Sequence, residues 1–141
     1  LVGMRLGAVM AARAAKHRAV RQLVLWDPIT DGHAYLPSVG HTAPSSRHAD
    51  TDLLGAVLTH QLRADVERIT PSSFGEVSSR TLVLASDPDT AVEPLAGHFR
   101  SLGVEAFTTL VPDVPVWRTE WERDGKGLAV SAANYITSWL N

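Results

Sequence analysis

Residues 1–15 read LVGMRLGAVMAARAA, and this stretch decides how the rest of the chain is interpreted. The first residues resemble the end of a buried strand. The alanine-rich run after them carries apolar residues at helical spacing, Met10 among them, which predicts a helix from about Arg5 to His17. Gly3 and Gly7 flank Arg5 at the junction, where two residues without side chains are expected to relieve crowding. The stretch therefore predicts a tight turn from strand to helix with Arg5 at its centre.

The composition limits the classes of function. The chain has 141 residues, of which 45% are hydrophobic and 20% charged, as expected of one folded domain. A net charge of −2 with scattered Lys and Arg offers no basic face for nucleic acid or an anionic membrane. No cysteine is present, which excludes disulfides, thiolate metal sites and cysteine nucleophiles. The longest apolar runs are too short to span a bilayer.

The beginning of the sequence adds a further expectation. Leu1 is not an initiator methionine, and no charged region or cleavage site of a signal peptide precedes it. We therefore expect a cytoplasmic protein whose sequence is the C-terminal part of a longer chain. The oligomeric state cannot be read from these residues.

Strands and helices are expected to alternate along the chain. Continuous apolar runs predict strands that are buried on both faces at about residues 22–26 and 81–85, and a third strand is predicted at about residues 104–110. Helical spacing predicts helices over residues 91–102 and 128–140. This order is typical of an α/β fold with a largely parallel sheet, in which the three strands should be parallel neighbours.

The segment between the first two of these strands has a different character. Asp31-Gly32 is a turn signal, and residues 38–50 are polar and rich in turn formers. Apolar residues at helical spacing predict a helix over about residues 53–69, which Thr70-Pro71-Ser72-Ser73 would end. We interpret residues 33–75 as a short helical insertion.

This succession resembles the C-terminal half of an α/β-hydrolase. In that family a G-x-S-x-G nucleophile elbow joins a strand to a helix, an acid follows a later strand and a histidine follows the last one. Here the elbow position is residues 3–7, the insertion would be the cap, and residues 86–89 form the acid loop. The stretch LVLWDPITDGHAYL looks nearest to the serine-aminopeptidase-like branch, which includes the hydrolases that accompany exosortase systems. The resemblance implies a partial α/β-hydrolase fold in one domain over residues 1–141.

Two departures from the family pattern matter more than the match. Arg5 stands where the elbow serine should be, and a guanidinium stays protonated and cannot attack a carbonyl. Residues 111–141 contain no histidine, so the general base is also missing. We therefore expect a degenerate catalytic triad in a non-catalytic or accessory binding protein. The alternatives are an active hydrolase of ester or amide bonds with an unusual or externally completed site, and an α/β domain without hydrolase ancestry.

The acid position has two candidates. Asp89 and Asp87 both follow a buried strand, and Asp89 fits the spacing slightly better. The competing interpretation is that one of them caps the helix predicted from Ala91.

Arg5 itself has two interpretations. Beside the first turn of its helix, at the carboxyl end of the strands, it would favour an anion such as a carboxylate or phosphate. It would otherwise form a salt bridge, for instance with Asp27 or Asp89. The expected ligand is a small acyl or anionic molecule.

The tryptophans and histidines complete the candidates. Trp117 and Trp121 lie in the loop where the family histidine is found, and they either line a pocket or cover the core. Trp26 and Trp139 are expected to pack. His98 is predicted at the surface of its helix, and the six histidines show no metal-ligand spacing, so neither metal nor cofactor is expected.

Overall fold

The computed structural model describes residues 1–17, 19–39, 51–53, 56–77, 80–113 and 129–141. Its centre is a sheet of four strands in the order β1-β2-β5-β6, in which all three neighbouring pairs are parallel. The strands are β1 (Val2–Met4), β2 (Gln22–Trp26), β5 (Arg80–Ala85) and β6 (Ala106–Leu110). This arrangement confirms the predicted α/β class and the parallel pairing.

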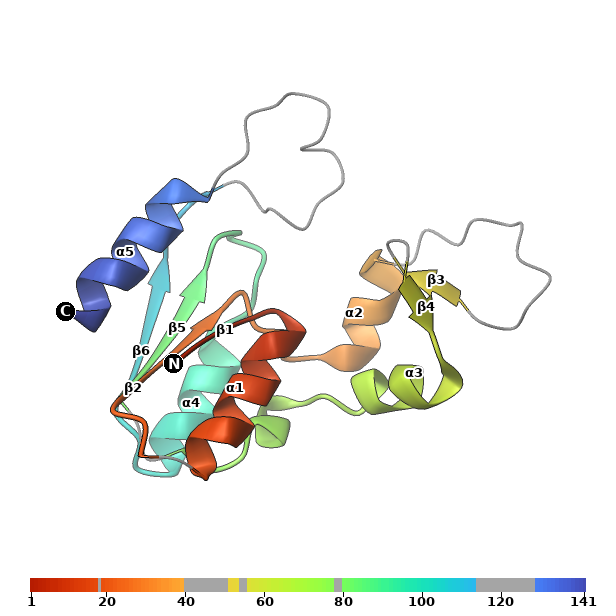
Figure 1. Cartoon of the computed structure of the whole chain (residues 1–141), viewed down its shortest axis with the longest axis horizontal. Coiled ribbons are helices and arrows are strands. Elements are labelled where there is room, and N and C mark those ends of the chain that lie inside the picture. The colour runs from red at the N-terminus through yellow and green to blue at the C-terminus, as the bar shows by residue number, and fades with distance from the viewer. Residues whose placement is uncertain (18, 40–50, 54–55, 78–79, 114–128) are drawn as a thin grey trace.

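Helices cover both faces of the sheet (Figure 1). One face carries α1 (Leu6–Lys16) and α4 (Glu93–Ser101), and the other carries α5 (Val130–Leu140). The strand residues alternate between the two cores, so that Leu23 and Leu25 face α1 while Val24 faces α5. Both faces of the central strands β2 and β5 are therefore buried, which explains why their sequences read as continuous apolar runs, whereas β1 and β6 at the sheet edges are more exposed.

Helix α1 lies on the sheet through its smallest side chains. Its buried residues are Ala8, Val9, Ala11, Ala12 and Ala15. Met10, which the helical spacing placed on the apolar face, is 73% exposed. Short side chains let the helix axis approach β1 closely, so the bulky methionine faces outward.

Gly3 is required by this close approach. A Cβ atom at Gly3 would lie 2.5 Å from the backbone oxygen of Gly7 and 2.6 Å from the Cβ of Ala11. A Cβ at Gly7 would meet no atom within 4 Å. The relief of crowding expected from both glycines is therefore confirmed at Gly3 and is wrong for Gly7.

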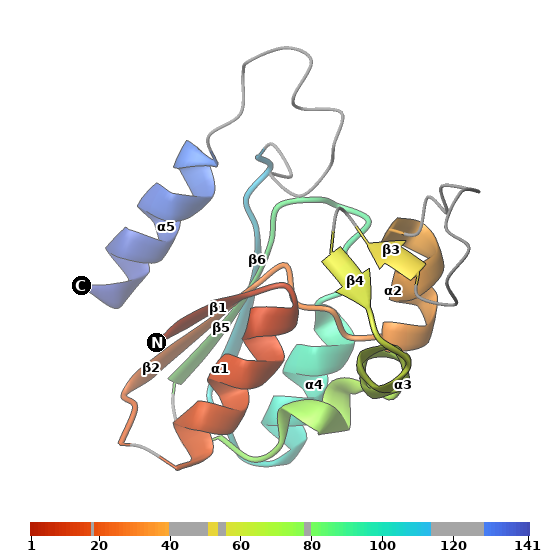
Figure 2. The ribbon, with the colours of Figure 1, turned by 45° about the vertical axis from the view of Figure 1, so that its right-hand side comes forward.

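The insertion between β2 and β5 differs from the prediction (Figure 2). It contains α2 (Gly32–Val39), an antiparallel pair formed by β3 (Thr51–Leu53) and β4 (Ala56–Leu58), α3 (His60–Glu67) and the 3₁₀ turn η1 (Pro71–Phe74). The helix predicted from residue 53 was wrong at residue 53 and over residues 56–58, because a short apolar run suits a strand as well as a helix. The insertion is not wholly helical.

The turn predicted at Asp31-Gly32 is instead the start of α2. The Oδ1 atom of Asp31 accepts a hydrogen bond from the N–H of Ala34 at 2.9 Å, as an N-cap does. Gly32 lies against α3, where an added Cβ would be 1.6 Å from the backbone oxygen of Val66. The aspartate begins the helix, and the glycine lets α2 pack on α3.

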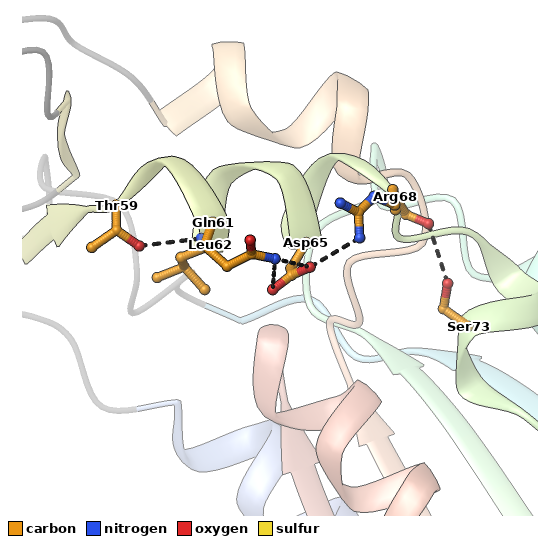
Figure 3. A network of polar contacts seen from close by, with 6 residues as sticks. All are labelled: Thr59, Gln61, Leu62, Asp65, Arg68 and Ser73. Carbon is orange, nitrogen blue, oxygen red and sulfur yellow. Dashed lines mark hydrogen bonds and ion pairs between the residues drawn. The ribbon is translucent and has the colours of Figure 1, made fainter.

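Polar contacts hold the exposed side of α3 (Figure 3). Thr59 caps the helix by accepting a hydrogen bond from the N–H of Leu62 at 3.2 Å. Asp65 then receives hydrogen bonds from Gln61 and from Arg68. These groups are exposed, so each ion pair contributes only about 0–1 kcal/mol, and they stabilise α3 mainly as a local network.

Candidate functional site

Three strand-end residues lie side by side at the carboxyl edge of the sheet. Arg5 follows β1, Asp27 follows β2 and Ser86 follows β5. Backbone hydrogen bonds continue the sheet into this edge, because the N–H of Arg5 donates to the oxygen of Trp26 and the N–H of Asp27 donates to the oxygen of Leu84. In open α/β sheets this edge is where ligands bind.

Arg5 occupies a strained backbone conformation. Its φ is 55° and its ψ is −125°, a combination that side-chain-bearing residues adopt rarely because Cβ crowds the backbone. The conformation turns the chain sharply from β1 into α1, whose first residue is Leu6. Such a strained strand-to-helix turn presents the central side chain at the top of the sheet, as a nucleophile elbow does. At this turn the chain carries a guanidinium.

The Arg5 guanidinium lies between the sheet and the insertion. Its Nη1 donates to the backbone oxygen of Asp27 at 3.5 Å, and its carbon Cζ lies 5.0 Å from the ring centroid of Tyr35 on α2. Stacking on an aromatic ring suits the flat, weakly hydrated guanidinium. The predicted partner Asp27 is therefore beside Arg5, although the hydrogen bond goes to its backbone oxygen.

Asp27 is the second strained residue of this edge. Its φ is 43°, and it precedes Pro28, which restricts its backbone further. The side chain is fully buried. Its Oδ1 accepts the N–H of Ser86 at 2.7 Å, while its Oδ2 has no hydrogen-bond partner among the described residues. A buried oxygen without a partner is uncommon in folded proteins and calls for an explanation.

The environment favours the neutral form of Asp27. Burial raises the pKa of its carboxyl, because an ionised group loses its hydration inside the protein. Hydrogen bonds from Ser86 and the charge of Arg5 lower this pKa, but burial outweighs them. The site therefore holds one permanent positive charge and one carboxyl group that resists ionisation.

Ser86 supports the edge and is not placed as a nucleophile. It is 3% exposed, and its Oγ accepts a hydrogen bond from the indole N–H of Trp26 at 2.6 Å. Its backbone N–H donates to Asp27. The hydroxyl and the backbone N–H of Ser86 thus link the end of β5 to the end of β2 and hold Asp27 in place.

The acid-loop candidates form a local turn. Oδ1 of Asp87 accepts a hydrogen bond from the N–H of Asp89 at 3.0 Å. Helix α4 begins at Glu93 with Val92 as its N-cap and no side-chain cap. The interpretation that either aspartate caps this helix was therefore wrong, because α4 begins two residues later than predicted.

The remaining predicted residues have different outcomes. Trp117 and Trp121 lie outside the described residues. Trp26 and Trp139 pack against the core on the α5 side, as predicted. His98 is partly buried with its Nε2 enclosed, so the prediction of a surface residue was wrong; its ring packs on Phe99.

No metal site is found at this edge, and the described residues contain no group of three or more His, Asp or Glu placed to hold a metal ion. An open depression of about 450 Å³ exists elsewhere, lined by Lys16, Glu76, Val77 and Leu102. It lies where α1 and α4 end, away from the turn at Arg5. Its two opposite charges favour neither an anion nor a cation.

Sequence reasoning named Asp27 only as a possible salt-bridge partner of Arg5, and it missed Tyr35 altogether. Asp27 directly follows a buried strand, as the acid-loop aspartates do, and that signal was available. It was interpreted only as the end of the strand and a partner for Arg5. Tyr35 carried no comparable signal, because its position depends on how α2 packs.

No known protein-family model matches the chain, and no curated protein matches its sequence. No helix in the described part of the chain is long and apolar enough to cross a membrane. The chemistry of the site therefore rests on its own geometry.

Proposed function

We propose that this chain is an α/β-hydrolase-like protein with a degenerate catalytic triad, which binds a small oxyanion at Arg5 and does not hydrolyse acyl substrates. The observation that supports this most is the strained turn at Arg5. A conformation of this kind costs about 1–3 kcal/mol and persists mainly where function requires it. In a hydrolase a nucleophile at this turn attacks the ligand. In this chain the Arg5 cation at the same position would bind the ligand instead.

The surroundings of Arg5 suit an oxyanion. The first turn of the 11-residue helix α1 follows directly and contains no acidic residue. Backbone N–H groups and the helix dipole favour negative charge at such an end. A carboxylate placed there would receive hydrogen bonds from the helix and from the guanidinium, whose flat fork matches carboxylate geometry.

The binding test is an NMR titration of the protein with butyrate. We expect saturable shifts at the backbone N–H signals of Leu6, Gly7 and Ala8. In Arg5→Gln we expect the affinity for butyrate to fall at least tenfold. Glutamine keeps a long polar side chain but removes the charge. Arg13→Gln, on the same helix and exposed, is the matched control and should bind as the native chain does.

A catalytic test distinguishes the proposed non-catalytic protein from the alternative of an active hydrolase. The protein should show no covalent labelling by a fluorophosphonate and no burst of product with activated acyl esters, because both require an activated serine. Stoichiometric labelling, with Ser86 the first serine to inspect, would contradict the proposal. Arg5→Ser should remain inactive, since no described group takes the place of the histidine base.

A further inference from the structure

The open depression where α1 and α4 end is a separate feature of the surface, away from the turn at Arg5. Its volume is about 450 Å³, and it is lined by Lys16, Glu76, Val77 and Leu102. Lys16 is the last residue of α1, Leu102 directly follows α4, and the other two residues follow η1. Volumes of about 300–1,000 Å³ are usual for small-molecule sites in proteins. The depression is therefore large enough for a small ligand.

Packed elements fix the shape of this depression. Helices α1 and α4 lie side by side on one face of the sheet (Figure 2), and η1 contacts both of them. The Nε of Arg13 on α1 donates to the backbone oxygen of Ser73 at 3.3 Å. Phe74 and Phe99 are fully buried, and their rings meet edge to face with centroids 6.4 Å apart. These contacts anchor η1 against the two helices, so the residues that follow it are held beside the helix ends.

The depression offers apolar surface to a ligand. Val77 is 5% exposed and belongs to the core between the helices and the sheet, whereas Leu102 is 44% exposed. An aliphatic group that covers the exposed leucine would remove apolar surface from water, which favours binding. The depression therefore suits a ligand with a short aliphatic part.

Two opposite charges stand at the same depression. Lys16 and Glu76 are both exposed, and neither forms a hydrogen bond or an ion pair with another described residue. They also do not pair with each other, which leaves both charges available to a ligand. A simple anion attracted by Lys16 would be repelled by Glu76, and a simple cation would meet the reverse. A molecule that carries one charge of each sign can pair with both side chains.

We propose that this depression binds a free α-amino acid with an aliphatic side chain, such as leucine. The carboxylate pairs with Lys16, the ammonium group pairs with Glu76, and the side chain lies on Val77 and Leu102. An α-amino acid carries both charges and its side chain around one carbon atom, which matches two opposite charges beside apolar surface. No covalent bond forms or breaks. Binding here is independent of an anion at Arg5.

The binding is expected to be weak and to need both charges of the ligand. Water screens ion pairs with exposed side chains, so we expect a Kd on the order of 1 mM for leucine. A ligand without one of its charges loses one ion pair and is still repelled by the protein charge that remains unpaired. We therefore expect the loss of either ligand charge to reduce the affinity about fivefold.

The test is an NMR titration at neutral pH that follows the methyl signals of Val77 and Leu102. L-Leucine should shift both signals saturably. Two analogues with the same branched chain are the controls: 4-methylpentanoate lacks the ammonium group, and 3-methylbutylamine lacks the carboxylate. Both should bind about fivefold more weakly than leucine. The backbone N–H signals at the start of α1, recorded in the same spectra, report any carboxylate bound at Arg5.

Charge variants test the two ion pairs directly. Lys16→Gln and Glu76→Gln change exposed side chains, and each should weaken leucine binding about fivefold. The double change Lys16→Glu with Glu76→Lys keeps one charge of each sign and should restore much of the lost affinity. The exposed pair of Arg63 and Glu67 on α3 provides matched controls, so Arg63→Gln and Glu67→Gln should bind leucine as the native chain does.

The outcomes separate the amino-acid site from the anion site. The amino-acid site is overturned if leucine does not shift the Val77 and Leu102 signals saturably, or if either analogue binds as tightly as leucine. It is also overturned if Lys16→Gln and Glu76→Gln bind leucine as the native chain does. Shifts only at the start of α1 would support the proposed function at Arg5 and overturn the amino-acid site. Saturable shifts at the depression that need both charges support the amino-acid site, whatever holds at Arg5.

Discussion

Positive φ angles occur at two kinds of residue in the described part of this molecule, at glycines and at charged residues. Gly103 has a φ of 79° just before β6, and Gly75 has a φ of 71° just after η1. Both occur in connections that turn the chain towards the next strand. At the carboxyl edge of the sheet the same side of φ space is occupied by Arg5 and Asp27.

The difference indicates which turns are structural and which are functional. Glycine adopts positive φ without steric cost, so the connections that lead into β5 and β6 carry little backbone strain. A charged residue in the same region is strained, and Asp27 is also buried with one oxygen unpartnered. The fold could relieve both costs with glycine or asparagine. Their presence together is what we expect of a binding site that uses the guanidinium and the carboxyl group.

The largest expected effect tests whether packing imposes the shape of the Arg5 turn. Gly3→Ala should destabilise the protein by about 3 kcal/mol or prevent folding, because its Cβ would overlap backbone atoms of Gly7 and Ala8 that cannot rotate away. Gly7→Ala is the matched control. With no atom within 4 Å of its Cβ it should stabilise α1 by about 0.5–1 kcal/mol. Chemical denaturation of both variants provides the measurement, and equal effects would show that β1 and α1 are not closely packed.

An intermediate effect is expected at Asp27. Because its pKa is raised in the folded protein, the carboxyl destabilises the fold as pH rises from its unfolded value of about 3.9 through the folded value. Asp27→Asn should therefore gain stability over the native chain with rising pH, by at most about 1.4 kcal/mol per pH unit. Asparagine also tolerates positive φ.

The measurement is urea denaturation of both proteins at pH 4.5 and pH 8. A gain that is the same at both pH values would mean that ionisation of Asp27 does not act on stability. A loss of stability at pH 8 would mean that the ionised carboxylate is stabilised at this edge. Asp27 would then no longer count as a costly residue in the comparison with Gly75 and Gly103.

The sequence was sufficient for the sheet and its covering helices. The runs that became β2 and β5 are apolar and bounded by turn formers, and burial on both faces leaves no other arrangement for them. The β3–β4 pair was missed because three-residue strands are too short to show a period. Met10 was misplaced because helical spacing does not reveal that a helix packs through its alanines.

The candidate site was predictable only in part. Gly3 and Arg5 could be recognised because residue identity alone marks a tight turn and a missing nucleophile. The burial of Asp27 and its positive φ depend on the meeting of β1, β2 and β5, which brings together residues far apart in the chain. Tyr35 reaches Arg5 only because α2 packs beside the sheet.

The most direct test of the central claim compares Arg5→Gly with Arg5→Ala. Both remove the guanidinium and its stacking on Tyr35, so they differ only in the strain that a Cβ creates at a φ of 55°. We predict that Arg5→Gly is more stable than Arg5→Ala by about 1 kcal/mol in urea denaturation, and that neither binds butyrate. If Arg5→Gly is no more stable than Arg5→Ala, or if either still binds butyrate as the native chain does, strain at Arg5 is not maintained for anion binding and the account is contradicted.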